Sequence, residues 1–340
     1  MIQAALTRLL DGRDLTRSEA HGVMDEIMRG EATPAQMGAF LVALRAKRET
    51  PDEIAGCAEA MRAHVVRVRP GRSDLVDTAG TGGDGAKTFN ISTAAALVAA
   101  AAGAGVAKHG NRAVSSASGS ADVLESLGFD LELAPERIER SIDELGFGFL
   151  FAPSHHPAMR HAAPVRRELA TRTVFNVLGP LTNPAGARAQ VVGVYAPELV
   201  RTLAEVLVQL GAERAYVVHG ADGIDELSPA GPNLVCEVAG GAVREWELDP
   251  LDLGIPRCRP SDLAGGSPER NAAAIREILA GARGPRRDAV LLNAAGAIAA
   301  AGHADDLRAG LAAAAQAVDS GAAGEHLGAL VAFSREEVPA

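Results

Sequence analysis

Apolar side chains recur at helical spacing through the first 70 residues. Met37, Phe40, Leu41 and Leu44, for example, fall on one face of a helix, because residues three and four apart share a face. Three segments open with a capping box, in which the first residue caps the helix and the fourth reaches back to it: Thr16 with Glu19, Thr33 with Gln36, and Thr50 with Glu53. The pattern predicts a small all-helical domain over residues 1–70.

The pattern changes after Pro70, where short apolar runs begin to alternate with longer helical segments. The runs that predict strands are residues 75–76, 105–107, 149–151, 191–194, 216–218 and 290–292. Helical patterns such as residues 197–210 and 269–279 separate most of them, which is typical of a parallel sheet covered by helices. The sequence therefore predicts an α/β fold, with a larger domain over residues 71–340 built on a mainly parallel central sheet.

Two segments need separate interpretation. Residues 160–176 are rich in charge and poor in strand formers, and we expect a helical return segment near residues 160–185 that packs on the first domain. Residues 88–106 carry no charge, but alanine is nearly neutral in transfer to lipid, and Gly103 and Gly105 break one end. This second segment predicts a buried helix and not a membrane span.

The composition narrows the classes of function. The 340 residues include 33 Lys and Arg against 43 Asp and Glu, a formal net charge of −10, with only 3% aromatic residues. Such a chain disfavours a nucleic-acid coat and an aromatic carbohydrate groove. No export signal opens the chain, and Cys57, Cys236 and Cys258 share no metal-ligand spacing. We expect a cytoplasmic protein with reduced cysteines, bound neither to nucleic acid nor to a membrane.

A glycine-rich turn, residues 80–85, follows the first predicted strand. Alone it satisfies the dinucleotide-binding pattern G-x-G-x-x-G, which requires an acidic residue about 20 positions later to hold a ribose hydroxyl. No Asp or Glu occurs between Asp84 and Asp122, and the next strand ends in Lys108 and His109. The dinucleotide interpretation is therefore disfavoured.

The acid-free interval is rich in hydrogen-bond donors. Its cations and hydroxyls are Lys87, Lys108, His109, Arg112, Thr88, Ser92, Thr93, Ser115, Ser116, Ser118 and Ser120. Glycine amides in a tight turn form an anion nest, Ser92 and Thr93 are placed to cap a helix, and Lys108 and Arg112 could bind phosphate. Two donor clusters on successive strand ends favour a ligand with two phosphate groups. An ordinary glycine turn with a capped helix would explain residues 80–85 alone.

Asp225 and Glu226 follow another predicted strand. Adjacent carboxylates on a loop are often only solvated, but beside a phosphate site they are candidate Mg²⁺ ligands. Asp84, amid anion-binding amides, is expected to hold an amide or a metal-bound water. A zinc site at His155, His156 and His161 is disfavoured, because Pro157 interrupts the helix that would align them.

Taken together, these residues resemble the anthranilate phosphoribosyltransferases, a family of nucleoside-phosphorylase-like phosphoribosyltransferases. The resemblance spans nearly the whole chain. It is carried by residues 39–41, 47–50, 80–84, 90–93, 108–112, 156–159, 165–167, 175–184 and 225–226, in that order. One departure is Ala170, where the family usually has glycine.

The resemblance implies a small helical domain beside a larger α/β domain, and a homodimer formed through the helical one. It implies transfer of the phosphoribosyl group of 5-phosphoribosyl 1-diphosphate to the amine of anthranilate, in tryptophan biosynthesis. It also implies Mg²⁺, as two ions, with Ser92, Asp225 and Glu226 as ligands.

The family's substrate contacts also carry over. Those for the phosphoribosyl donor are Gly80, Gly83, Asp84, Thr88, Asn90, Ile91, Ser92, Thr93, Lys108, His109, Gly110, Asn111, Arg112, Ala113, Val114, Ser115, Ser116 and Ser120. Those for anthranilate are Gly80, Asn111 and Arg166, with His156 nearby. We expect no general acid or base, because an aromatic amine is already neutral at pH 7 and the chemical difficulty lies in the departing diphosphate.

Other functions remain as alternatives. A pyrimidine nucleoside phosphorylase shares the fold and a similar glycine turn, but Asp225–Glu226 and the Asn183–Pro184 block disfavour it. A non-catalytic relative that binds nucleic acid or a protein is disfavoured by the acidic charge and the intact candidate metal ligands.

Overall fold

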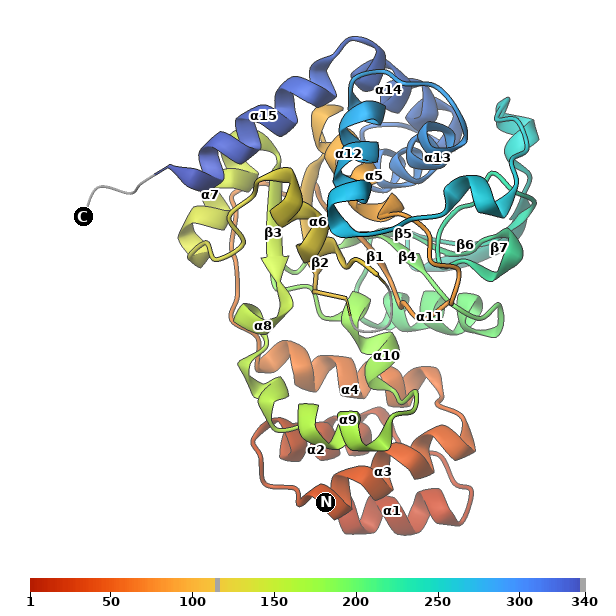
Figure 1. The fold of residues 1–340 in the computed structure, drawn as a ribbon. Coiled ribbons are helices and arrows are strands. Elements are labelled where there is room, and N and C mark those ends of the chain that lie inside the picture. Colours follow the sequence, from red (N-terminus) through yellow and green to blue (C-terminus); the bar gives the residue numbers. More distant parts are fainter. Residues whose placement is uncertain (114–116, 337–340) are drawn as a thin grey trace.

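A small helical unit lies beneath a larger α/β unit (Figure 1). The structure is a computed structural model and describes residues 1–113 and 117–336. The small unit is formed by α1 (Ile2–Leu10), α2 (Arg17–Met28), α3 (Pro34–Lys47) and α4 (Pro51–Ala63). The three predicted capping boxes are confirmed, with Thr16, Thr33 and Thr50 each accepting the amide of the fourth residue.

A later segment of the chain returns to this unit. It consists of α8 (Ala152–His155), η1 (Pro157–Arg160), α9 (Ala163–Leu169), α10 (Phe175–Leu178) and η2 (Gly179–Leu181). Ala162 and Val165 share one hydrophobic cluster with Phe40 and Leu41 of α3. The return segment therefore packs its side chains on the helical unit, and its ribbon runs between the two units (Figure 1).

The larger unit is built on a seven-stranded sheet in the order β3-β2-β1-β4-β5-β6-β7. The strands are β1 (Leu75–Gly80), β2 (Gly105–Gly110), β3 (Phe147–Phe151), β4 (Ala189–Gly193), β5 (Arg214–His219), β6 (Asn233–Ala239) and β7 (Ala242–Leu248). β1 to β5 pair in parallel, whereas β6 and β7 are antiparallel. The predicted α/β fold with a mainly parallel sheet is confirmed.

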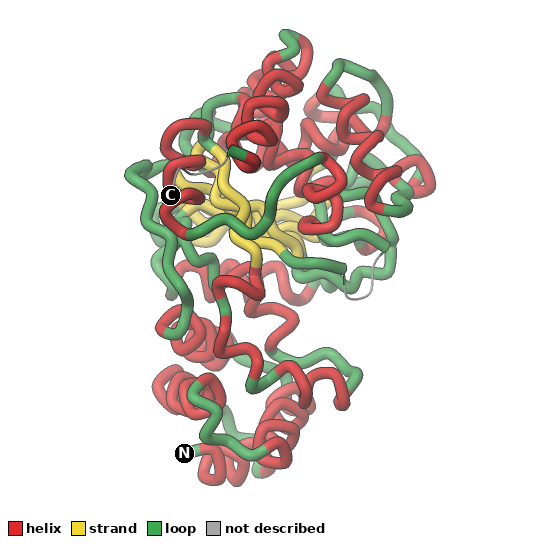
Figure 2. The backbone as a smooth tube through the Cα atoms, turned by 60° about the vertical axis from the view of Figure 1, so that its left-hand side comes forward, coloured by secondary structure: helices red, strands yellow, loops and turns green. Residues whose placement is uncertain are grey.

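Helices cover both faces of the sheet, which lies as a central layer in Figure 2. They are α5 (Ile91–Ala101), α6 (Ser120–Leu127), α7 (Pro135–Leu145), α11 (Glu198–Gln209), α12 (Pro268–Leu279), α13 (Pro285–Ala300), α14 (Leu307–Asp319) and α15 (Ala322–Arg335). Successive strand residues face opposite ways, so Val191 packs with α5 and α13, whereas Val192 packs with α11 and the helical unit. One face of the sheet thus shares its core with the small unit.

Two details differ from the sequence analysis. Residues 290–292, predicted as a strand, lie in α13, which is buried on nearly all sides, so its sequence carries no amphipathic pattern to separate helix from strand. The β6–β7 hairpin was missed, although Gly240 and Gly241, both with positive φ, form the two-residue turn expected between such strands.

The uncharged segment forms α5, whose residues from Ala94 to Ala99 are fully buried, as predicted. Within the described residues, no helix has the length and apolar character needed to cross a membrane.

Ala170 ends α9 in the left-handed conformation, with φ 45° and ψ 30°, and is exposed. A Cβ is unfavourable there, and glycine is the usual residue at such helix ends. We expect Ala170→Gly to raise the free energy of unfolding by about 0.5–1 kcal/mol. Chemical denaturation measures it, with Ala163→Gly at the exposed first position of α9 as a control that should not stabilise. Equal losses in both variants would contradict the strain at Ala170.

Candidate active site

The candidate site lies where the parallel strands end, beside the point at which the strand order reverses between β1 and β4. β1, β2 and β4 all end in glycine, at Gly80, Gly110 and Gly193. A Cβ on Gly80 would overlap the Asp225 carboxylate, and one on Gly193 would overlap the Asp225 backbone carbonyl. Gly80 and Gly193 therefore leave the space in which the acidic loop lies across the sheet edge.

The acidic loop contacts the backbone amides of the glycine turn and of α5. The Gly82 amide donates to Asp225 Oδ2 at 2.7 Å, and the Ser92 amide donates to Glu226 Oε1 at 3.1 Å. Asp84 accepts the amides of Ala86 and Asp225 at 3.1 and 3.3 Å, as the sequence analysis expected of a carboxylate among amides. The structure thus brings Asp84, Ser92, Asp225 and Glu226 together.

Both carboxyl groups of the acidic pair are raised in pKa. Burial, followed by repulsion from Asp225, raises the pKa of Glu226 to about 8, while Lys108 opposes the shift. Burial, followed by repulsion from Asp84, raises the pKa of Asp225 to about 7. A divalent cation at this place would offset both the desolvation of the two carboxylates and the repulsion between neighbouring carboxylates.

The chemistry of this donor set suits Mg²⁺, although the protein supplies only some of the ligands that the ion needs. Within residues 1–113 and 117–336, no group of three or more His, Cys, Asp and Glu side chains is arranged to hold a metal ion. Two carboxylates with open positions suit Mg²⁺, which commonly completes its ligands with substrate phosphate and water.

Lys108 lies under the strand ends and does not project from them. Its side chain is 1% exposed, and Nζ donates to the Thr78 carbonyl at 2.5 Å and to Thr78 Oγ1 at 3.3 Å. Burial lowers the pKa of Lys108, while Asp77 and Glu226 act in the opposite sense. Its ammonium therefore offsets part of the charge of Glu226, and its hydrogen bonds in the structure are to Thr78.

Asp77 is a buried polar residue that the sequence analysis missed. Its Oδ1 accepts the His109 amide at 3.1 Å, and its Oδ2 accepts Asn183 Nδ2 at 2.7 Å. Burial raises the pKa of Asp77 to about 6, against the attraction of Lys108. An aspartate within an otherwise apolar strand was the signal in the sequence.

The start of α5 differs from the expected capping. Asn90 is the residue before the helix, but its side chain does not cap it, and Ser92 and Thr93 lie inside the helix. Instead, Asn90 Nδ2 donates to the Ser118 carbonyl at 3.1 Å, and Asn90 Oδ1 accepts Asn271 Nδ2 at 2.9 Å. Ile91 and Thr93 are buried, so among the proposed donor contacts they offer only backbone.

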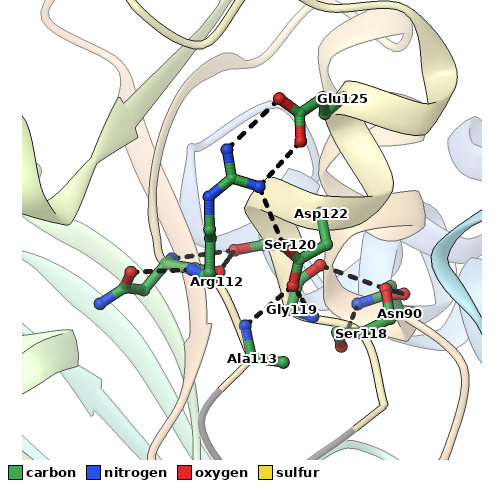
Figure 3. Close-up of polar contacts among 9 residues, drawn as sticks. Asn90, Arg112, Ala113, Ser118, Gly119, Ser120, Asp122 and Glu125 are labelled. Atoms are coloured by element: carbon green, nitrogen blue, oxygen red, sulfur yellow. Dashed lines mark hydrogen bonds and ion pairs between the residues drawn. The ribbon is translucent and has the colours of Figure 1, made fainter.

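Arg112 is engaged by carboxylates of α6 (Figure 3). Its Nη1 lies 2.8 Å from Glu125 and 3.1 Å from Asp122. Asp122 also accepts the amides of Ala113 and Gly119 at 2.9 and 2.8 Å. Both residues are thereby held against the first turn of α6. Val114, Ser115 and Ser116, which the sequence analysis placed among the donor contacts, lie outside the described residues.

The remaining predicted donor contacts lie in the same loops. Gly80 and Gly110 end β1 and β2, Gly83 belongs to the exposed turn, Thr88 pairs with Ala264, and Ser120 opens α6. The Asn111 amide donates to Ser120 Oγ at 3.2 Å.

A second group of residues lies on the return segment and against it. The rings of His109 and His156 lie 5.0 Å apart, and His109 Nδ1 lies 3.1 Å from the Gly179 carbonyl. Both Nε2 atoms are buried without a hydrogen-bond partner. Burial lowers the pKa of His109 to about 3 and that of His156 to about 4, so both rings are neutral at pH 7.

Arg166 belongs to this group. Its guanidinium lies 5.0 Å above the Phe175 ring and forms no ion pair with any described residue. Burial lowers the pKa of Arg166, because a positive charge is unfavourable there without an anion. A half-buried unpaired guanidinium is suited to bind a carboxylate in a bidentate manner.

The family models define the class of this chain as a glycosyl transferase. Residues 72–324 match the family described as glycosyl transferase family, a/b domain, and residues 3–65 match the glycosyl transferase family, helical bundle domain.

Relatives narrow this class. The chain is 58% identical over 335 residues to the anthranilate phosphoribosyltransferase of Anaeromyxobacter sp. strain Fw109-5, covering 98% of this chain and 99% of the relative. The crystal structure of anthranilate phosphoribosyltransferase from Thermus thermophilus is 51% identical, covers 98% and 99% of the two chains and has a TM-score of 0.93. The Saccharomyces cerevisiae anthranilate phosphoribosyltransferase in complex with PRPP and Mg is 28% identical, with 98% and 97% coverage and a TM-score of 0.89. This chain belongs to the anthranilate phosphoribosyltransferase family.

The raised pKa values make a prediction about stability. A carboxyl group whose pKa is raised on folding binds more protons in the folded than in the unfolded chain, so stability falls as pH rises between the two values. Asp225 and Glu226, with pKa values of about 7 and about 8, should therefore make the metal-free protein less stable as pH rises from about 4 toward 8.

Thermal denaturation in EDTA and in Mg²⁺ across this range checks the expectation. Stabilisation by Mg²⁺ should grow with pH, and the double variant Asp225→Asn with Glu226→Gln should lose both that gain and part of the slope. A gain from Mg²⁺ that is the same at every pH would contradict the assignment.

Proposed function

We propose that this protein transfers the phosphoribosyl group of 5-phosphoribosyl 1-diphosphate to the amine of anthranilate, giving N-(5-phosphoribosyl)anthranilate and diphosphate, a step in tryptophan biosynthesis. The observation that carries the proposal is the contact of Asp225 and Glu226 with the amides of the glycine turn and of α5, where the strand order reverses. The names of the relatives support both substrates, and the yeast complex supports PRPP with Mg²⁺.

The donor is proposed to lie over the glycine turn and the start of α5. Within the described residues, the amides of Gly83, Asp84 and Gly85 have no hydrogen-bond partner, so they are available to phosphate oxygens. The exposed side chains of Asn111 and Lys87 lie in the loops after β2 and β1. We propose Ser92, Asp225 and Glu226 as Mg²⁺ ligands, and two ions in the complete site.

The acceptor is proposed to lie against the return segment. Arg166 is unpaired and suits the anthranilate carboxylate, and the neutral His109 and His156 each offer a free ring nitrogen. Gly80 and Asn111, at the ends of β1 and β2, would place the acceptor amine beside the donor.

The chemistry then follows from position and charge. Bound Mg²⁺ would neutralise the charge that accumulates on the diphosphate as it leaves. The turn amides hold phosphate oxygens in fixed directions, and Arg166 holds the acceptor so that its nitrogen faces C1 of the ribose. The buried His109 and His156 rings are neutral at pH 7, so they can orient the acceptor. They are not needed as a general acid or base, because the amine of anthranilate is itself neutral at this pH.

We also propose the assembly and the domain division. The helical domain spans residues 1–70 with the return segment near 160–185, and residues 71–340 form the phosphoribosyl-binding domain. A homodimer through the helical domain is supported by exposed apolar side chains there, with Leu10 of α1 78% exposed and Val42 of α3 46% exposed. We propose that the protein acts in the cytoplasm.

The loss of anthranilate fluorescence on adding the phosphoribosyl donor, with and without Mg²⁺, tests the function directly. Turnover that requires both is the expected result. Phosphorolysis of thymidine in place of that reaction would identify a nucleoside phosphorylase, and a salt-dependent DNA complex without turnover would identify a non-catalytic binding protein.

The acidic pair gives one prediction on activity. Asp225→Asn with Glu226→Gln should lower the rate by at least about 100-fold and shift the Mg²⁺ dependence to higher concentration, since neutral amides bind the ion less well. Initial rates over a Mg²⁺ titration measure both effects. Unchanged rates at limiting Mg²⁺ would reject the metal role.

Arg166 gives a second prediction on activity. Arg166→Ala should raise the KM for anthranilate by about tenfold or more, because a charge-assisted hydrogen bond is worth about 1.5–3 kcal/mol. Arg167→Ala, at the exposed neighbouring position, is the matched control and should resemble the wild type. An effect confined to the donor's KM would show that the acceptor site lies elsewhere.

A further inference from the structure

One arginine outside the predicted site reaches the glycine turn from the return segment. Arg172 lies between α9 and α10, and its Nη2 donates to the Gly83 carbonyl. Its guanidinium carbon lies 3.6 Å above the centre of the Tyr195 ring, two residues beyond β4. The side chain therefore spans from the connection of the two units to the loop that follows β1.

The turn needs such a contact because its backbone is intrinsically free. Gly82, Gly83 and Gly85 have φ values of 70°, 74° and 78°, and glycine moves readily between this region and others. Thr81 is already held, since its amide donates to the Gly193 carbonyl at 2.9 Å and its Oγ1 accepts the Tyr195 amide at 3.1 Å. Beyond Gly82, whose amide meets Asp225, the Arg172 contact holds the next carbonyl of the turn.

Peptide geometry converts this contact into an orientation. In a planar trans peptide the carbonyl and the following N–H point in opposite directions. When Arg172 holds the Gly83 carbonyl on one side, the Asp84 N–H must point to the other, and this amide is among those without a partner in the described residues. Fixing a carbonyl from outside thus aims an anion-binding amide inward.

The charge of Arg172 is not otherwise used. The guanidinium forms no ion pair with any described carboxylate, in a chain with net charge −10. Its Nη1 is buried without a hydrogen-bond partner, which costs about 1–3 kcal/mol and is unusual for a surface arginine. A planar guanidinium can stack on a ring and donate in its own plane at once, and the ammonium of lysine cannot.

We propose that Arg172, stacked on Tyr195, is a positioning residue for the donor site: it fixes the Gly83–Asp84 peptide so that the Asp84 amide faces the diphosphate. The proposal rests on the proposed function, because it assigns the turn to the phosphoribosyl donor. It also ties the shape of the donor turn to the segment that carries Arg166.

The test compares the kinetic constants for the two substrates. Arg172→Ala and Arg172→Lys should each raise the KM for phosphoribosyl diphosphate about tenfold, the factor lost with one charge-assisted hydrogen bond, while the KM for anthranilate changes less than about twofold. Tyr195→Phe keeps the ring and should resemble the wild type, whereas Tyr195→Leu should share the donor defect. Arg167→Ala is the control for removing a nearby exposed charge.

Binding of inorganic diphosphate with Mg²⁺, measured by calorimetry, gives a readout that does not depend on turnover. The Arg172 variants should bind it about tenfold more weakly than the wild type. The proposal would be overturned if Arg172→Ala or Arg172→Lys bound diphosphate with the affinity of the wild type. It would also be overturned if both KM values rose equally and the melting temperature fell. In either case, turnover by the wild-type protein would leave the proposed function standing. A wild type that neither binds diphosphate nor turns over anthranilate would overturn both.

Discussion

Two carboxyl groups held out of solvent, those of Asp225 and Glu226, set the constraint on which this architecture depends. They fit at the sheet edge because β1 and β4 end in glycine, at Gly80 and Gly193, and leave space for the acidic loop. The buried ammonium of Lys108 offsets the charge of Glu226, and the backbone amides of Gly82 and Ser92 donate to Asp225 and Glu226, respectively. The acidic pair and the glycine turn therefore lie side by side with opposite preferences. The carboxylates are suited to a cation, and the free amides of the turn are suited to an anionic donor.

The fold was largely predictable because its signals are local. The capping boxes at Thr16, Thr33 and Thr50 and the alternation of strands with helices depend on near neighbours in the sequence, and the structure has them. The strand predicted at residues 290–292 was wrong, because α13 is buried on nearly all sides and its sequence carries no amphipathic period. The β6–β7 hairpin was predictable from Gly240–Gly241 and was missed in favour of a sheet of parallel strands.

The site was predictable in its parts and less so in its contacts. The glycine turn and the acidic pair were recognised from residue types, and the structure places them together. Lys108 and Arg112 were expected to bind phosphate because they are cations near a turn, yet Lys108 bonds to Thr78 and Arg112 pairs with Asp122 and Glu125. Which partner a cation meets depends on contacts distant in sequence. For the same reason Arg172, 89 residues from Gly83, gave no signal before the fold was known.

The central claim is that one sheet edge holds the donor between the turn amides and the acidic pair. A crystal structure of the protein with phosphoribosyl diphosphate and Mg²⁺ at saturating concentration tests it most directly. The account predicts diphosphate oxygens on the amides of residues 83–85, and a metal ion bonded to Asp225 and Glu226. A donor bound away from the glycine turn, or a metal ion that contacts neither carboxylate, would contradict it.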